Sequence, residues 1–133
     1  MTDHIPSSIN SSGHALLSSL AGTATADGTD LFATRDDAVT WLHAAGLLPD
    51  DAMISNSEHG ALVRLRDALR EVIDARAAGM AAPDAAARLS RALADGRLVV
   101  TVSPAGQAVL ASSARASYSN TVAAIAIAVS AAW

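Results

Sequence analysis

Three arginines of one predicted helix, Arg64, Arg66 and Arg70, are the side chains best suited to chemistry in this sequence. Arg66 and Arg70 lie one helical turn apart on one face, a spacing typical of a two-arginine clamp for an anion or an acidic partner segment. Surface salt bridging is the alternative for the same pair. Asp27 and Asp30 are candidate internal partners, and pairing with them would make the cluster structural. The candidate ligand- or partner-binding residues are therefore Arg66, Arg70 and Asp30.

Patterns for catalysis and metal binding are missing from the sequence. The four histidines include no i, i+4 pair, and no cluster of carboxylates accompanies them. The chain has no cysteine, which excludes a thiol nucleophile, a disulfide and thiolate-bound zinc. A G-x-S-x-G elbow and a glycine-rich phosphate loop are also missing. We therefore predict no catalytic residue, no metal site, no cofactor and no enzymatic activity.

The charge balance disfavours direct binding of nucleic acid. The nine basic residues are all arginine, 13 residues are acidic, and the formal net charge is −4. A domain that grips a DNA backbone is usually positive. The longest apolar stretch, 122–133, is shorter than the roughly 20 residues of a membrane-spanning helix, and the N-terminus has no secretory signal. These features predict a soluble, cytoplasmic protein without a membrane segment.

Helix signals dominate the middle and the end of the chain. Helices are predicted over 34–46, 57–78, 83–95 and 115–132 from their apolar spacing and from the residues that start and stop them. Thr34 is a good N-cap for the first of these helices, and Pro83 suits the first turn of the third. The long helix carries the three arginines named above.

Extended character is confined to two segments. Residues 97–111 predict an antiparallel β-hairpin, because β-branched residues precede a Pro-Ala-Gly turn and an apolar return. The apolar run 14–21 is predicted to be a strand that can join this hairpin. Residues 1–13, rich in Ser and Asn, are predicted to be a loose arm. The expected architecture is a single domain over 14–133 of the α+β class, mainly helical, with about four helices and a small antiparallel sheet.

The last predicted helix is apolar on every side. A helix of this kind is either central in a core or covered by a partner. One face carries four large apolar residues, which we take as candidate interface residues: Val122, Ile125, Val129 and Trp133. A homodimer through 122–133 is accordingly one hypothesis for the assembly.

Two motifs add a resemblance to a known family. Trp41-Leu42 with Gly46-Leu47 ends one helix, and Leu65-Arg66 with Leu69-Arg70 lies in the long helix. With the order of segments from about Ala15 to Ala132, they resemble the N-terminal ABATE domain of the CGNR zinc-finger family of stress-induced transcription regulators. Family members continue into a cysteine-containing zinc knuckle credited with nucleic-acid binding. This chain has no such segment. The resemblance therefore implies zinc only if a cysteine-containing segment exists, and it implies no DNA contact for the residues of this chain.

Three functions stay open from the sequence. The first is a non-enzymatic regulatory or sensor domain of a transcription regulator, which binds an unidentified small molecule or protein segment. The second is a self-associating interaction module with 122–133 as its interface helix. The third is an enzyme with a dispersed site, which has the least support because no local signature accompanies it.

Overall fold

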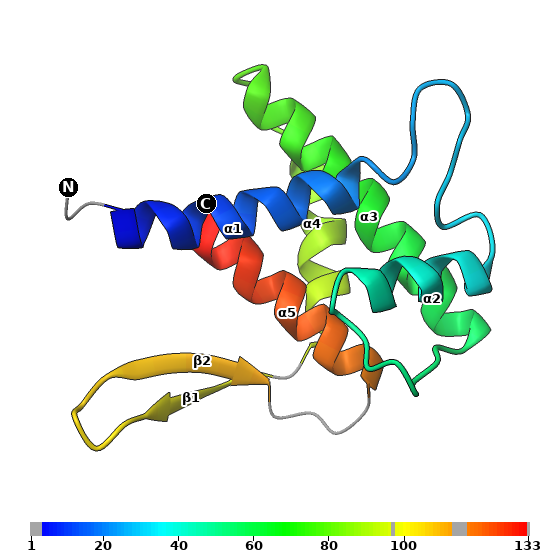
Figure 1. The fold of residues 1–133 in the computed structure, drawn as a ribbon. Helices are drawn as coiled ribbons and strands as arrows, with labels where there is room; N and C mark the ends of the chain where they lie inside the picture. The colour runs from blue at the N-terminus through cyan, green and yellow to red at the C-terminus, as the bar shows by residue number, and fades with distance from the viewer. Residues whose placement is uncertain (1–3, 97, 113–116, 133) are drawn as a thin grey trace.

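The computed structural model describes residues 4–96, 98–112 and 117–132. Figure 1 shows a body of helices with one hairpin beside it. In chain order the elements are α1 His4–Ala21, α2 Arg35–Ala44, α3 Asn56–Ala77, α4 Pro83–Leu93, β1 Leu98–Val102, β2 Ala108–Ser112 and α5 Ser117–Ala132. Helix α1 packs along α5, and α3 packs along α4.

Local signals explain where α2 and α3 begin. The Thr34 hydroxyl accepts a hydrogen bond from the Asp37 N–H at 3.0 Å, as predicted for an N-cap. Helix α3 begins with a capping box, in which the Ser55 hydroxyl accepts from the Glu58 N–H and the Glu58 carboxylate accepts from the Ser55 N–H. Gly46, at a φ of 73°, lies just beyond α2, where a left-handed residue ends a helix at no steric cost.

The prediction of a strand at 14–21 is wrong, because this segment is the C-terminal part of α1. Leu17, Leu20 and Ala21 are spaced i, i+3 and i+4, and all three are buried in the core. Helix α1 also includes residues 4–13, where the sequence predicts a loose arm. The partner that stabilises α1 is α5, since a Cβ on Gly13 would lie only 3.2 Å from the Ala128 carbonyl oxygen.

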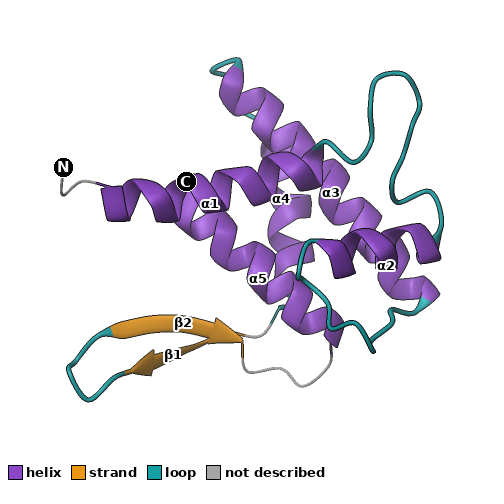
Figure 2. Cartoon of the chain, in the orientation of Figure 1, coloured by secondary structure: helices purple, strands orange, loops and turns teal. Residues whose placement is uncertain are grey.

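The predicted α+β class is also wrong, because the part of the chain that the structure describes is mainly helical, with five helices. Strands β1 and β2 pair antiparallel, with Val100 opposite Leu110. They form only a two-stranded hairpin that extends beside the helices (Figure 2). Without a strand from the N-terminal segment, the described residues contain no sheet layer on which helices could pack. Arg97, at the start of the predicted hairpin, lies outside the described residues.

The core is formed where the helices meet. Buried apolar side chains come from every described helix and from the loop between α1 and α2, and the largest that are fully buried are Leu17, Leu20, Phe32, Leu42, Leu62, Leu65, Leu69, Val122 and Ile125. Phe32 packs edge-to-face on Trp41, with ring centroids 5.4 Å apart. The loop therefore contributes to the core as directly as the helices do.

Candidate functional site

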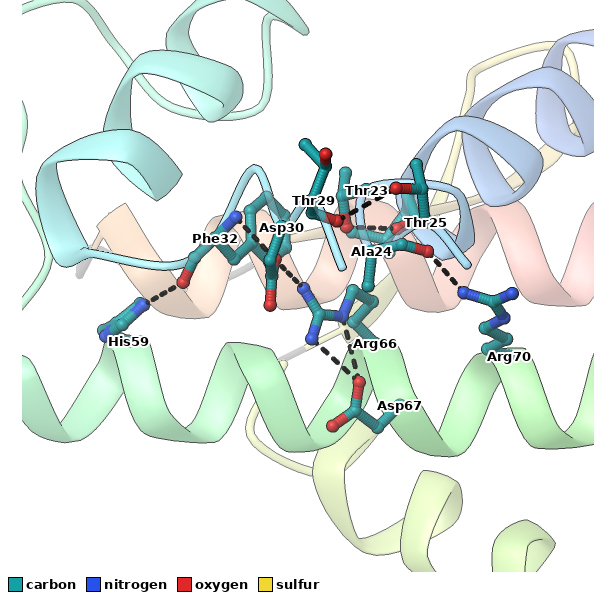
Figure 3. A network of polar contacts seen from close by, with 11 residues as sticks. Thr23, Ala24, Thr25, Thr29, Asp30, Phe32, His59, Arg66, Asp67 and Arg70 are labelled. Carbon is teal, nitrogen blue, oxygen red and sulfur yellow. Dashed lines mark hydrogen bonds and ion pairs between the residues drawn. The ribbon is translucent and has the colours of Figure 1, made fainter. Parts of the chain in front are cut away.

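The loop between α1 and α2 is fastened to α3 by three side chains that α3 supplies (Figure 3). His59 Nε2 lies 2.7 Å from the Phe32 carbonyl oxygen. Arg66 donates to Asp30, and Arg70 donates to the Ala24 carbonyl oxygen. Because these α3 residues are seven and four positions apart, they lie on one face of the helix. Helix α3 thus holds the loop at three points along its length.

Arg66 is the central anchor of this network. Its side chain is only 4% exposed, and each of its three nitrogens donates to a carboxylate. Nη1 lies 2.5 Å from Asp30 Oδ1, while Nε and Nη2 lie 3.0 and 2.9 Å from Asp67 Oδ1. Its guanidinium carbon also lies 5.3 Å from the centre of the Phe32 ring, within the range of a cation–π contact.

The loop has its own turn, which presents Asp30 to Arg66. The Leu31 N–H donates to the Thr23 carbonyl oxygen and the Thr25 N–H donates to the Thr29 carbonyl oxygen, both at 2.8 Å. Asp30 Oδ1 also accepts from the Phe32 N–H at 2.8 Å. Burial alone would raise the pKa of Asp30, but the bonds from Arg66 and Phe32 outweigh it and hold that pKa below its ordinary value of 3.8.

The lowered pKa of Asp30 predicts a pH-dependent stability. The charged carboxylate stabilises the folded state above about pH 4, and this contribution is lost as the pH falls through the lowered pKa. Asp30→Asn removes the contribution. In urea unfolding we expect the difference in stability between wild type and Asp30→Asn to be constant near neutral pH and to shrink below about pH 4.

Asp36→Asn provides the matched control for that experiment. The Asp36 side chain is 81% exposed, and its nearest cation, Arg35 Nε, lies 4.0 Å away. We expect this variant to follow the wild type closely at every pH, since exposed pairs of this kind contribute little. A stability difference for Asp30→Asn that stays unchanged in acid would contradict the role assigned to Asp30.

The structure brings Arg66, Arg70 and Asp30 together, but as partners of one another and of the loop. The internal pairing considered for Asp30 is confirmed by its ion pair with Arg66. Asp27 instead accepts from the Thr25 hydroxyl and the Thr29 N–H within the loop. Arg66 and Arg70 therefore hold the loop on α3 through Asp30 and the Ala24 carbonyl oxygen, and the other two nitrogens of Arg66 donate to Asp67 of α3 itself.

The three candidate interface residues of α5 that the structure describes are all at least half-buried within the chain itself. Val122 and Ile125 are fully buried in the core of the chain itself, and Val129 is half-buried against it. Trp133 lies outside the described residues. The apolar character of α5 around Val122 and Ile125 is thus explained by its central position beneath α1 and α4.

A groove between α3 and α4 gathers a second set of charged side chains. It encloses about 460 Å³, which is within the range of small-molecule sites. Helix α3 contributes three residues and the C-terminal half of α4 with its following turn contributes four: Ala61, Arg64, Asp67, Arg88, Arg91, Ala92 and Asp95. We refer to these seven residues as the α3–α4 groove. Ala61 and Ala92 contribute the small apolar side chains of its lining.

The arginines of the α3–α4 groove differ in their partners. Arg88 Nη2 lies 2.5 Å from Glu71 Oε2 on α3, an ion pair that ties the two helices together. Within the described residues, Arg64 and Arg91 form no ion pair, and both are exposed. One of the two carboxylates in the groove, that of Asp67, already accepts from Arg66. Two guanidinium groups therefore converge on the groove with their donors available.

A second hollow continues the α3–α4 groove towards α5. It shares Ala61 and Asp95 with the groove and adds Tyr118 and Ser119 from α5. Burial raises the pKa of the Tyr118 phenol above its ordinary value, and the carboxylates of Asp95 and Glu58 raise it further. The phenol is protonated at neutral pH, as an ordinary tyrosine is, and can donate a hydrogen bond there.

Tyr118 allows a direct test of this geometry, because the chain has a single tyrosine. The folded state holds the phenol proton more tightly than the unfolded chain, whose pKa is near the ordinary 10.0. This contribution to stability is complete below that pH and is lost as the pH rises through the raised pKa. We expect phenolate absorbance to appear at higher pH in the native protein than in urea. Coincident titrations would contradict the burial of Tyr118.

Sequence reasoning missed the α4 side of the groove, although a signal was present. Arg88, Arg91, Ala92 and Asp95 are spaced i, i+3, i+4 and i+7, which places them on one helical face. Nothing in the sequence states that this face lies beside Arg64 of α3, since that depends on how the two helices pack.

The described residues show neither a metal-ligand cluster nor a membrane-spanning helix. In that part of the chain, no group of three or more His, Cys, Asp or Glu side chains is arranged to hold a metal ion. Among the described helices, none is both long and apolar enough to cross a bilayer.

The five helices of the described residues and the attached hairpin define a small, mainly helical domain with an arginine-lined groove. The sequence pattern of the ABATE family, described as "Putative stress-induced transcription regulator", matches residues 14–132. The chain belongs to this family, which confirms the resemblance seen in the sequence. It has no cysteine with which to build a zinc knuckle. No curated protein and no solved structure is significantly similar to it.

Proposed function

We propose that this chain is the regulatory module of a transcription regulator and that it receives a small effector in the α3–α4 groove without chemical turnover. The family description agrees with a regulatory role. The observation that carries the proposal is the groove itself, which Arg64 of α3 and Arg91 of α4 line together with small alanine side chains. A regulator of transcription acts in the compartment that holds DNA, which supports a cytoplasmic location.

The position of the groove suits a regulatory role. Asp95 lies at the end of the groove, and the next residue, Gly96, packs on the backbone of α5. A ligand between α3 and α4 would contact the segment that sets α4 against α5. An effector shifts a conformational equilibrium only through contacts that differ between two states. The turn at Asp95 and Gly96 connects the groove to α5. A change in the contacts of the ligand with this turn would therefore be transmitted to α5.

Thermal unfolding in the presence of small molecules tests the proposal. A panel that includes anionic, neutral and cationic metabolites should contain one class that raises the Tm in a saturable way. A ligand at about 100 times its Kd stabilises the folded state by about 2.7 kcal/mol. For a domain of this size that corresponds to a rise of roughly 8 to 13 °C. A panel in which no class changes the Tm would contradict the proposal.

A further inference from the structure

We infer that the ligand of the α3–α4 groove is a small polyvalent anion, with carboxylate or phosphate groups held between Arg64 of α3 and Arg91 of α4. This inference rests on the proposed function and names its ligand class. Arg66 itself is already engaged, because its guanidinium donates to Asp30 of the loop and to Asp67 of α3.

The charges of the groove favour an anion. Three arginines line it against two carboxylates, although acidic residues outnumber basic ones in the whole chain. Asp67 is held by Arg66 and Arg88 is held by Glu71, so each of these charges already has a partner. Arg64 and Arg91 line the groove without an ion pair to a described residue. Of the two carboxylates in the groove, only that of Asp95 has no bond to another described residue. Guanidinium groups bind carboxylates and phosphates through paired, charge-assisted hydrogen bonds.

The groove and the adjoining hollow also limit the size and shape of the ligand. Ala61 and Ala92 leave room that longer side chains would fill, and the enclosed volume fits a metabolite rather than a folded partner. Tyr118 and Ser119 lie beyond Ala61 in the adjoining hollow, and their hydroxyls suit uncharged polar atoms. A compound with an anionic end and a hydroxyl-bearing body matches both parts.

Calorimetric titration with pyrophosphate, citrate, glucose 6-phosphate and glucose tests the inference on the whole chain. We expect saturable binding of the anions with a Kd of about 1 mM or tighter and no binding of glucose. Arg64→Gln and Arg91→Gln should each weaken anion binding about tenfold, since a charge-assisted bond contributes about 1.5 kcal/mol or more. Arg35→Gln, an exposed arginine of α2, is the matched control and should bind as the wild type does.

A second variant is expected to bind anions more tightly. Asp95→Asn removes a carboxylate from the groove, so we expect it to bind pyrophosphate severalfold more tightly. Failure of every anion to bind the wild type would overturn the inference, as would equal binding by wild type and the Arg64→Gln/Arg91→Gln double variant. In either case a neutral or cationic compound that raises the Tm would leave the proposed function standing. If no compound of any charge raises the Tm, the proposed function fails as well.

Discussion

Replacing Arg66 with alanine is expected to lower the free energy of unfolding by about 3 kcal/mol, because removing one partner of a buried ion pair leaves the other uncompensated. Asp30 and Asp67 would both lose their bonds to the guanidinium, and Phe32 would lose the cation over its ring. The two carboxylates are partly exposed, so water would relieve some of the cost. The measurement is urea unfolding followed by circular dichroism.

Arg64→Ala is the matched control for Arg66→Ala. Arg64 belongs to the same helix but is exposed and forms no ion pair with a described residue. Its removal should change the stability by no more than about 0.5 kcal/mol, as is usual for surface positions. If both variants lost the same stability, the division of α3 into a structural arginine and an available one would be contradicted.

Replacing Gly96 with alanine is expected to cost about 2 kcal/mol through overpacking. A Cβ on Gly96 would lie 2.6 Å from the Ala123 nitrogen and 2.8 Å from its Cα, closer than real side chains approach a backbone. Because these neighbours are backbone atoms of α5, the helix itself must move. Urea unfolding measures the loss of stability, and amide shifts of α5 in NMR spectra report the displacement.

Gly60→Ala is the control, since it makes the same change inside α3. The nearest atom to a Cβ at Gly60 is Arg64 Nη1 at 3.3 Å, which is the tip of a flexible side chain. Alanine is a better helix former than glycine, so this variant should be more stable by up to about 1 kcal/mol. Opposite signs for the two glycines are the expected result. A neutral Gly96→Ala would show that α4 and α5 do not meet as described.

The sequence predicts α2, α3 and α4 well because their signals are local. Thr34 and Pro83 lie where caps and first-turn residues are expected, and Gly46 ends α2. The sequence also contains the capping box of Ser55 and Glu58, which places the start of α3 at Asn56, one residue earlier than the apolar pattern alone. Caps and breakers act within one turn of chain, so these elements need no knowledge of the tertiary fold.

Helix α1 could not be predicted in the same way. Its last part is short and apolar, and a run of this length is ambiguous between strand and helix. The spacing of Leu17 and Leu20 fits a helix, and Ile5 and Ile9 are spaced i, i+4, but the other residues of 4–12 are mostly small and polar and give only a weak helix signal. The partner of this helix is α5, more than a hundred residues away in sequence. Tertiary packing therefore decides the structure of α1.

The candidate site was predicted in part. Asp30 was named as an internal partner of the arginines, and its ion pair with Arg66 is present. The sequence also contains a signal for the burial of Arg66. Leu62, Arg66 and Leu69 are spaced i, i+4 and i+7, which places Arg66 on the buried face of the helix. The α3–α4 groove depends on the packing of two helices, so its composition becomes visible only in the structure.

The central claim is that α3 carries one structural arginine, Arg66, and one arginine, Arg64, that is available to a ligand. The most direct test is an NMR titration of the arginine Nε–H signals with pyrophosphate. The signals of Arg64 and Arg91 should shift together and saturate at one dissociation constant. Those of Arg66, whose Nε already donates to Asp67, should stay in place. Saturable shifts at Arg66 with none at Arg64 and Arg91 would contradict the account.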